Sequence, residues 1–367
     1  MTKQKTILVC PLDWGLGHDT RCIPVIQSFL NQNCTVIIGL SGSQKILLQQ
    51  EFPSLTFIDL KGYEVEYPKS GSMALKMLLQ LPKINKAIKD EQIWLDKIID
   101  EHNIDLVVSD NRYGLWSEKV KSILITHQLF IKAPFGEQLL EKKAQYYFDK
   151  FNEIWIPDVE GENNLSGDLS HKKSLPEKFK FIGLLSRFSN KIVTSSVPKS
   201  FGTYREDNHF EFDFMAILSG PEPQRSIFEN IILKQISTTN LKGVLIRGLP
   251  ETNEKLKMEN SNIQVFNHLA TEEFLNYLQK SKVIISRSGY STIMDLTVLG
   301  KKAILIATPG QTEQEYLAEY HFEKGHFYAQ KQSEFELVNA LKESENYNGI
   351  KMEENTSLSK IIIEVLN

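Results

Sequence analysis

Two loops of the sequence carry residues that could handle a proton and a phosphate. The first is Gly15-Leu-Gly-His18, which follows a short apolar stretch and opens a helix-like pattern. Its glycines would let a ligand approach the backbone, and His18 could take a proton from a hydroxyl near neutral pH. Gly-x-Gly is not the full dinucleotide fingerprint, because no third glycine follows. The alternative is a tight strand–helix turn with a surface histidine.

The second loop is the stretch Ser286-Arg-Ser-Gly-Tyr-Ser-Thr-Ile-Met-Asp295, which runs from an apolar strand into a helix. Unpaired N–H groups at a helix start favour an anion, and a nearby carboxylate can accept hydrogen bonds from a ribose diol. A neighbouring strand ends at Pro309-Gly310, before a helix start that carries Gln314 and Glu315, which could hold a sugar. The stretch indicates a nucleotide or nucleotide-sugar site; the alternative is an ordinary capped helix.

Polar residues follow three further strands. Ser219-Gly-Pro-Glu-Pro-Gln-Arg225 could hold a phosphate through Arg225, although its two prolines remove donors. A rigid loop with solvated charge is the alternative. The strand at 105–109 ends in Asp110-Asn-Arg112, and the strand at 122–126 ends in His127. Open α/β sheets place their ligands at such strand ends.

These loops belong to two series of alternating strands and helices, which predict an α/β protein with parallel sheets. Strands are expected at residues 7–10, 35–40, 55–59, 105–109, 122–126 and 153–156, and then at 180–184, 212–218, 241–247, 263–266, 283–285 and 303–306. Residues 158–176 resemble a loop or linker, and 189–211 an irregular loop. We expect two domains, 1–178 and 179–354, that face each other across a cleft, with a terminal helix at about 355–367 packing back on the first.

Size and composition narrow the class of protein. A chain of 367 residues fits two domains, and 41% hydrophobic with 24% charged residues is an ordinary globular composition. A net charge of -4 gives no electrostatic case for a nucleic-acid partner. Three cysteines without metal-ligand spacing argue against structural zinc and fit a reducing compartment. With neither a signal peptide nor a spanning segment, we expect a cytoplasmic protein.

The helix predicted at 73–102 has a first part that is apolar on most of its circumference and is flanked by lysines. Such a helix either packs on the sheet or, with residues 73–89, contacts the inner face of a membrane or a lipid-linked acceptor. Other chemistries lack their motifs: there is no Walker A sequence, no HExxH, no Gly-x-Ser-x-Gly elbow and no histidine cluster for a metal.

The motifs in this order resemble a glycosyltransferase of the GT-B fold, and more narrowly glycosyltransferase family 28. That family includes the N-acetylglucosaminyltransferase of peptidoglycan-precursor synthesis and diacylglycerol glycosyltransferases. Residues 286–295, then Leu299-Gly-Lys-Lys-Ala-Ile-Leu-Ile306 and Gln314-Glu315-Tyr316, are similar to its donor-domain motif, and Gly15-Leu-Gly-His18 to its N-terminal glycine loop. The resemblance implies two facing Rossmann-like domains, the N-terminal one for the acceptor and the C-terminal one for a nucleotide-sugar donor.

The resemblance also implies roles for individual residues. Asp295 would hold the ribose, where the family usually has Glu, Ser288 to Tyr290 would approach the diphosphate, and Gln314 and Glu315 would hold the sugar. The expected donor-binding residues are Gly15, Gly17, Gly220, Arg225, His268, Leu269, Arg287, Ser288, Gly289, Tyr290, Ser291, Thr292, Asp295, Gln314 and Glu315. The expected acceptor-binding residues are Asp13, Asn111, Arg112 and His127.

The family inverts the anomeric centre without a tightly held metal, so we predict no metal and no cofactor. His18 is the first candidate for the base, Asp110 the second and Asp13 the third. The sequence departs from the family at Asp13-Trp14 and at Pro221 and Pro223, which leaves the nucleotide, expected to be UDP, open. We predict transfer of a hexose or N-acetylhexosamine to a glycan or lipid-linked acceptor. The rival functions are a hydrolase or epimerase of the same fold and a non-catalytic nucleotide-sugar-binding subunit.

Overall fold

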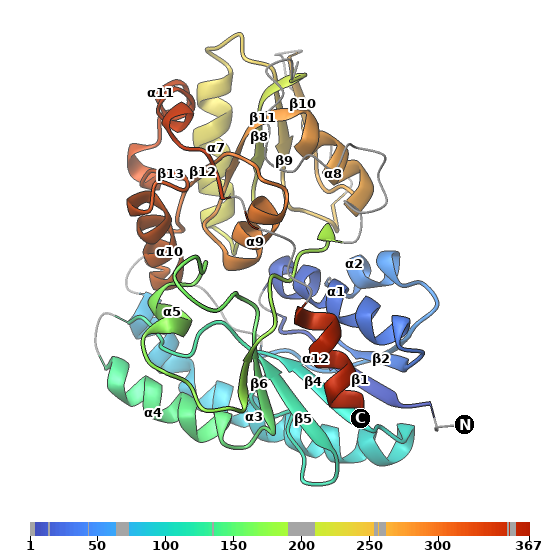
Figure 1. The fold of residues 1–367 in the computed structure, drawn as a ribbon. Coiled ribbons are helices and arrows are strands. Elements are labelled where there is room, and N and C mark those ends of the chain that lie inside the picture. The colour runs from blue at the N-terminus through green and yellow to red at the C-terminus, as the bar shows by residue number, and fades with distance from the viewer. Residues whose placement is uncertain are drawn as a thin grey trace. The chain divides into compact units, whose positions relative to one another are not determined.

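The computed structural model describes residues 4–13, 15–42, 44–63, 73–133, 136–189, 210–252, 256, 262–350, 352 and 357–367. Contacts within the chain divide it into two compact units (Figure 1). The first holds the chain up to Arg187 together with its C-terminal end from Glu354, and the second holds Phe188–Glu353. The loop predicted at 189–211 and the side chains of 73–78 fall largely or wholly outside the described residues.

The first unit is built on a parallel sheet of seven strands in the order β3-β2-β1-β4-β5-β6-β7. The strands are β1 (Thr6–Cys10), β2 (Thr35–Gly39), β3 (Thr56–Ile58), β4 (Leu106–Asp110), β5 (Lys121–Ile125), β6 (Glu153–Ile156) and β7 (Phe179–Phe181). The order reverses between β1 and β4, which pair from Ile7↔Leu106 to Cys10↔Ser109. Ligands of open α/β sheets bind at such a reversal, and here the loops after β1 and β4 meet.

The helices of the first unit are α1 (Leu16–Asn31), α2 (Gln44–Glu51), α3 (Met73–His102), α4 (Glu137–Phe148), the short α5 (Asp168–His171) and α12 (Ser357–Leu366). Helix α1 is continuous through Pro24, which lies near its middle. Helix α3 is continuous through Pro82. Its residues Leu95, Ile98 and Ile99 pack against Leu8 and Val107 of the sheet in one hydrophobic core.

The first unit extends past the boundary expected at residue 178. Strand β7, which we assigned to the second domain, pairs in parallel with β6, from Ile154↔Phe179 to Ile156↔Phe181. Asp158 then anchors the intervening segment by accepting hydrogen bonds from the N–H groups of Leu165 and Ser166, at 3.0 and 2.9 Å. The polar sequence of residues 158–176 therefore belongs to an ordered crossover and not to an interdomain linker. The red helix α12 in Figure 1 belongs to this unit, where Lys180 Nζ lies 3.7 Å from Glu364 Oε2.

The second unit repeats the architecture with six parallel strands in the order β10-β9-β8-β11-β12-β13. They are β8 (Phe212–Ile217), β9 (Gly243–Ile246), β10 (Ile263–Phe266), β11 (Ser281–Ser286), β12 (Ala303–Leu305) and the unpredicted β13 (Tyr328–Ala329). The helices are α7 (Gln224–Ile236), α8 (Thr271–Lys280), α9 (Tyr290–Val298), α10 (Thr312–Glu323) and α11 (Leu337–Glu343), with 3-10 turns at Gln332–Glu334 and Ser344–Asn346. The order reverses between β8 and β11, beside the predicted loops at 219–225 and 286–290.

The predicted α/β class, with one parallel sheet in each half, is confirmed. Among the described residues, no helix combines the length and the apolar character needed to cross a bilayer.

Candidate active site

Helix α1 starts at the reversal point of the first sheet and places His18 there. Gly15 precedes the helix with a φ of 121°, a conformation that favours glycine, and its C=O accepts a hydrogen bond from the N–H of His18 at 3.3 Å. The side chain of His18 is 18% exposed. The turn that the glycines predicted therefore leaves the histidine at the carboxyl end of the strands, within reach of solvent.

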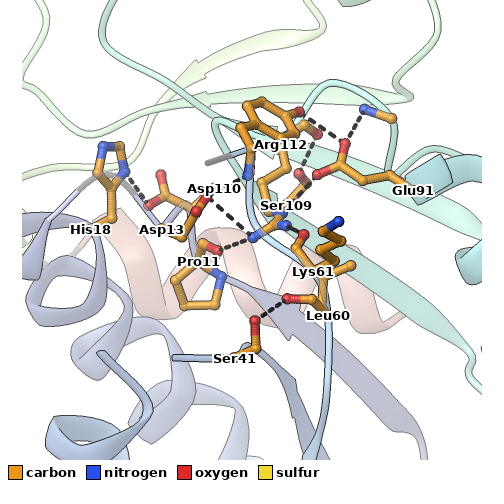
Figure 2. Close-up of polar contacts among 12 residues, drawn as sticks. Pro11, Asp13, His18, Ser41, Leu60, Lys61, Glu91, Ser109, Asp110 and Arg112 are labelled. Carbon is orange, nitrogen blue, oxygen red and sulfur yellow. Dashed lines mark hydrogen bonds and ion pairs between the residues drawn. The ribbon is translucent and has the colours of Figure 1, made fainter. Parts of the chain in front are cut away.

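Asp110 and Arg21 hold one nitrogen of the His18 ring. His18 Nδ1 lies 2.8 Å from Asp110 Oδ2 and 2.8 Å from Arg21 Nη2. Asp110, at the end of β4, is fully buried and also accepts hydrogen bonds at Oδ1 from Arg21 Nε, at 2.9 Å, and Nη2. Two residues 92 positions apart, both predicted as candidate bases, thus form one pair (Figure 2).

The environment keeps His18 neutral and Asp110 charged. Burial and the Arg21 cation lower the pKa of His18 against the opposing effect of Asp110. Burial alone would raise the pKa of Asp110, but Arg21 and His18 outweigh it and the pKa is lowered. A neutral imidazole oriented by a carboxylate is the arrangement of a general base.

Asp19 lies one position beyond His18 and is buried, and neither oxygen of its carboxyl has a hydrogen-bond partner among the described residues. Burial, together with the nearby charges of Asp110 and Asp13, raises its pKa well above the ordinary value. We therefore assign it a protonated carboxyl group at neutral pH.

A second network joins the neighbouring loops and accounts for Arg112. The buried guanidinium donates to Glu91 Oε1 at 2.8 Å, to Pro11 O at 3.1 Å and to Lys61 O at 2.5 Å (Figure 2). Glu91 Oε2 accepts hydrogen bonds from the hydroxyl of Tyr63, at 2.8 Å, and from the N–H of Gly114, at 3.0 Å. Every guanidinium nitrogen thus has a protein partner, so Arg112 holds these loops together, and its predicted contact with the acceptor stays a prediction.

The remaining acceptor candidates lie at the same edge. Asp13 accepts a hydrogen bond from the N–H of Tyr63 at 3.3 Å and is 17% exposed. Gly62 allows this approach, because a Cβ there would lie 1.9 Å from Asp13 Oδ2. Asn111 has a left-handed φ of 56°, and its buried Oδ1 has no partner among the described residues. His127 Nδ1 lies 3.3 Å from Arg21 Nη1. The structure therefore gathers all of these candidates around the first switch point.

In the second unit, the loop after β8 makes its turn at Gly220, with a φ of 96°. Arg225 is buried behind it, with Nε 2.6 Å from Glu222 Oε1 and Nη1 3.1 Å from Glu229 Oε2. Its Nη2 donates to Ser226 Oγ at 2.6 Å. Arg247 shares the carboxylate of Glu229, at 2.5 Å from Oε1. Arg225 is thus part of an ion-pair network, and its predicted role in phosphate binding stays a prediction.

Arg287 has a different environment from Arg225. It is 1% exposed and donates to the backbone carbonyls Ile306 O at 3.3 Å, Ala307 O at 3.2 Å and Gln224 O at 2.9 Å. Within the described part of the chain its Nε has no hydrogen-bond partner, and the guanidinium lies 4.5 Å from the centroid of the Phe228 ring. Burial lowers its pKa to about 10. Among the described residues, no carboxylate pairs with this cation.

Two of the helix starts around Arg287 carry no cap from the side chain of the N-cap residue. These are the starts of α9 and α10, whereas at α7 the N–H of Ser226 donates to Glu222 Oε2 at 3.2 Å. Ser288 Oγ donates to Gln314 O at 2.7 Å, which ties the starts of α9 and α10 together. Gln314 Oε1 accepts from the N–H of Thr308 at 2.9 Å, and Glu315 Oε1 from that of Gly310 at 2.8 Å. Two positive helix ends, and a cation with no carboxylate partner among the described residues, make this edge suited to an anion.

The other donor candidates differ in exposure. Tyr290 and Leu269 are buried, at 3% and 6% exposed, and therefore contribute to the core. Asp295 lies in the second turn of α9 and is half-buried. The remaining half-buried candidates of the second unit are His268, Gly289, Ser291 and Thr292. Gly15 and Gly17, also half-buried, lie in the first unit at the start of α1.

Sequence reasoning missed Arg21 and Thr308. The buried hydroxyl of Thr308 has no hydrogen-bond partner among the described residues, and it lies 3.8 Å from the position that a Cβ at Gly220 would take. Helical spacing could have found Arg21, because residues three apart share a face of α1 with His18. Thr308 has no such signal in its neighbours along the chain.

Two parallel sheets, each with a polar switch point, define the GT-B class of glycosyltransferases. Residues 227–361 match the glycosyltransferase family 28 C-terminal domain. An uncharacterized glycosyltransferase of Methanosarcina acetivorans is 26% identical over 336 residues, which cover 85% of this chain and 82% of that protein. Two solved structures share the fold: the calicheamicin glycosyltransferase CalG4 (TM-score 0.62, 12% identity, 99% and 94% of the two chains) and the UDP-GlcNAc 2-epimerase of Neisseria meningitidis (TM-score 0.61, 14% identity, 99% of each).

The chain is thus a GT-B glycosyltransferase similar to family 28, as its motifs predicted.

Proposed function

We propose that the protein transfers a hexose or N-acetylhexosamine from a UDP-sugar to an acceptor hydroxyl with inversion of the anomeric centre. The observation that carries this proposal is the contact of 2.8 Å between His18 Nδ1 and Asp110 Oδ2. With Nδ1 engaged, Nε2 is the ring nitrogen left to take the acceptor proton. Asp110 is fully buried, so it orients His18 and stabilises its charged form but does not meet the acceptor itself.

In this mechanism the acceptor O–H gives its proton to His18 Nε2 as its oxygen bonds to the anomeric carbon. The bond from that carbon to the diphosphate oxygen breaks, and UDP leaves with the electron pair. The starts of α9 and α10 would meet the leaving charge, with Arg287 as a buried cation behind them. Asp295 would hold the ribose, and Gln314 and Glu315 the donor sugar.

The proposal includes no resident cofactor and no metal, because the helix ends and Arg287 supply positive charge for the diphosphate. Accordingly, we expect EDTA to leave the transfer rate unchanged. A rate that needs added Mg²⁺ or Mn²⁺ would contradict this part of the proposal.

For the acceptor we propose a glycan or lipid-linked hydroxyl, reached by peripheral contact with a cytoplasmic membrane face through residues 73–89. Leu79 on α3 is 73% exposed and is followed by the exposed Lys83, Lys86 and Lys89. Core packing explains the other face of this helix, because Ile84, Ala87 and Ile88 pack with Leu12 and Tyr63. Co-sedimentation with anionic liposomes at low salt, reduced in Leu79→Ser, is the expected result; no binding by the wild type would refute membrane contact.

The test of the activity begins with a thermal-shift screen of nucleoside diphosphates and nucleotide sugars, since a ligand raises stability by mass action. The best donor, labelled in its sugar, is then incubated with and without a membrane-lipid extract. Label transferred to lipid by the wild type and not by His18→Ala supports the proposal. Release of free sugar or its isomerisation from donor alone would support a hydrolase or epimerase instead. Binding without turnover in either incubation would favour a non-catalytic subunit.

A further inference from the structure

Arg21 contacts the proposed base and two polar side chains beside it. It lies one helical turn after His18 on α1, and its side chain is 1% exposed. Its Nη2 lies 2.8 Å from His18 Nδ1, its Nε lies 2.9 Å from Asp110 Oδ1, and its Nη1 lies 3.3 Å from His127 Nδ1. One buried cation therefore contacts the base, the carboxylate that orients it and a second histidine.

We propose that Arg21 is a positioning residue with two effects: it fixes the Asp110 carboxylate, and it keeps the His18 ring in its neutral form until the acceptor hydroxyl is bound. The inference rests on the proposed role of His18 as base. It assigns to Arg21 a function that a purely structural arginine would not have.

The hydrogen-bonding capacities of the three groups carry the argument. A guanidinium only donates, so Arg21 Nη2 can bond to His18 Nδ1 only when that nitrogen has no proton. A carboxylate only accepts, so Asp110 Oδ2 can bond to the same nitrogen only when it has one. Both partners lie 2.8 Å from Nδ1, and only one contact can be a hydrogen bond at a time. The neutral ring carries one proton: a hydrogen bond from Arg21 to Nδ1 would leave that proton on Nε2, whereas a hydrogen bond from Nδ1 to Asp110 Oδ2 leaves Nε2 free to accept. Base action therefore requires the second tautomer, in which Arg21 donates to Asp110 Oδ1.

In the tautomer that acts as base, Nδ1 already carries the ring proton and donates to Asp110 Oδ2, and the free Nε2 takes the acceptor proton. The charged ring then carries one proton on each nitrogen. Arg21 keeps its hydrogen bonds to Asp110 Oδ1 and so holds the carboxylate in place. Its charge, however, repels the imidazolium. Arg21 should therefore make His18 a weaker but fully available base at neutral pH.

The other groups that act on His18 fit this account. Burial and Arg21 lower the pKa of His18, with a smaller lowering effect from His127, and Asp110 raises it. A single neighbouring charge commonly moves a pKa by about 1–3 units. Arg21 and Asp110 thus oppose each other, and removing one should reveal the effect of the other.

The test measures His18 itself as well as activity. The full-length protein, labelled with ¹⁵N in histidine, is titrated by NMR, and the His18 signals are identified by their loss in His18→Ala. In the wild type we expect a midpoint below 6.5, the ordinary value for histidine. In Arg21→Met we expect it to rise by about one unit or more, so that the acid limb of kcat/KM moves up equally. Arg21→Lys should keep the wild-type midpoint and lose rate, because a lysine cannot hold both Asp110 and His18.

Arg112→Met is the matched control, since Arg112 is another buried arginine of the same edge and, among the described residues, forms no hydrogen bond or ion pair with His18 or Asp110. Its His18 midpoint should equal that of the wild type. An unchanged midpoint in folded Arg21→Met, or a wild-type midpoint at or above 6.5, would overturn the inference. If Arg21→Met does not fold, the His18 midpoint is measured in the wild type and in Arg21→Met/Asp110→Asn. A wild-type midpoint at or above 6.5 then overturns the inference. A His18→Ala enzyme with full activity would instead refute the proposed function and leave the titration result standing.

Discussion

The two switch points occupy equivalent places in two parallel sheets and differ in how one buried arginine is paired. At the first, between β1 and β4, arginines face carboxylates: Arg21 pairs with Asp110, and Arg112 with Glu91. At the second, between β8 and β11, Arg225 also has carboxylate partners, but Arg287 donates to backbone carbonyls and pairs with no carboxylate among the described residues. The first edge holds a histidine between opposing charges, which suits proton transfer. The second keeps one buried cation without a counter-ion, which suits an anion.

Of these variants, His18→Ala should have the largest effect, and it tests the role of the first unit. Loss of a general base typically costs about 10²–10⁴-fold in rate, and we expect kcat for sugar transfer to fall in that range. Binding of UDP should be unchanged, because His18 belongs to the other sheet. A variant that lost UDP binding along with activity would show that the two edges do not act separately.

Arg287→Met tests the role of the second unit in binding the donor. Charge-assisted interactions are worth about 1.5–3 kcal/mol, so we expect UDP affinity to fall by about 10–100-fold, measured by calorimetry. The acid limb of the pH–rate profile should stay in place. Arg225→Met is the matched control: that arginine already has Glu222 and Glu229 as partners, and its removal should lower thermal stability more than UDP affinity. Equal losses of affinity in the two variants would count against an uncompensated charge at Arg287.

Asp295→Ala sharpens the assignment of the second edge. Loss of hydrogen bonds from a ribose to this carboxylate should weaken UDP binding by about tenfold. Binding of inorganic diphosphate should be unaffected, because it has no ribose. If diphosphate binding fell equally, Asp295 would act on the phosphates or on the fold, and not on the sugar.

Asp19→Asn tests the charge arrangement of the first edge through stability. The pKa of Asp19 is raised in the folded protein, so folding favours the neutral carboxyl, whereas the unfolded chain has it ionised at pH 7. Folding then takes up a proton, and this contribution to stability is lost as pH rises from the ordinary value toward the folded one. We expect the variant to unfold a few degrees higher at pH 7, corresponding to about 1 kcal/mol, with a smaller gain at pH 4. A gain that does not depend on pH would show that Asp19 is not held neutral.

Periodicity and the residues at strand ends were enough to predict most of the strands and both loops that flank the reversals. Strand β13 has only two residues and was missed, since two residues show no alternation. Strand β7 was found but placed in the wrong unit, because pairing between β6 and β7 depends on a crossover whose ends are not marked in its sequence. The glutamate partners of Arg112 and Arg225 could not be predicted, because a sequence does not show which carboxylate lies opposite an arginine.

By itself, the sequence determined which residues stand at the ends of strands: His18 after β1, Asp110 after β4 and Ser288 after β11. Their types and places follow from local patterns, which a chain carries along its length. Only the tertiary structure decided that β1 lies beside β4, and so that His18 and Asp110 meet across 92 positions with Arg21 between them. It also decided that Arg112 has a counter-ion and Arg287 has none among the described residues. Strand order and burial are properties of the packed sheet, and they fix the electrostatic environment on which each residue's chemistry depends.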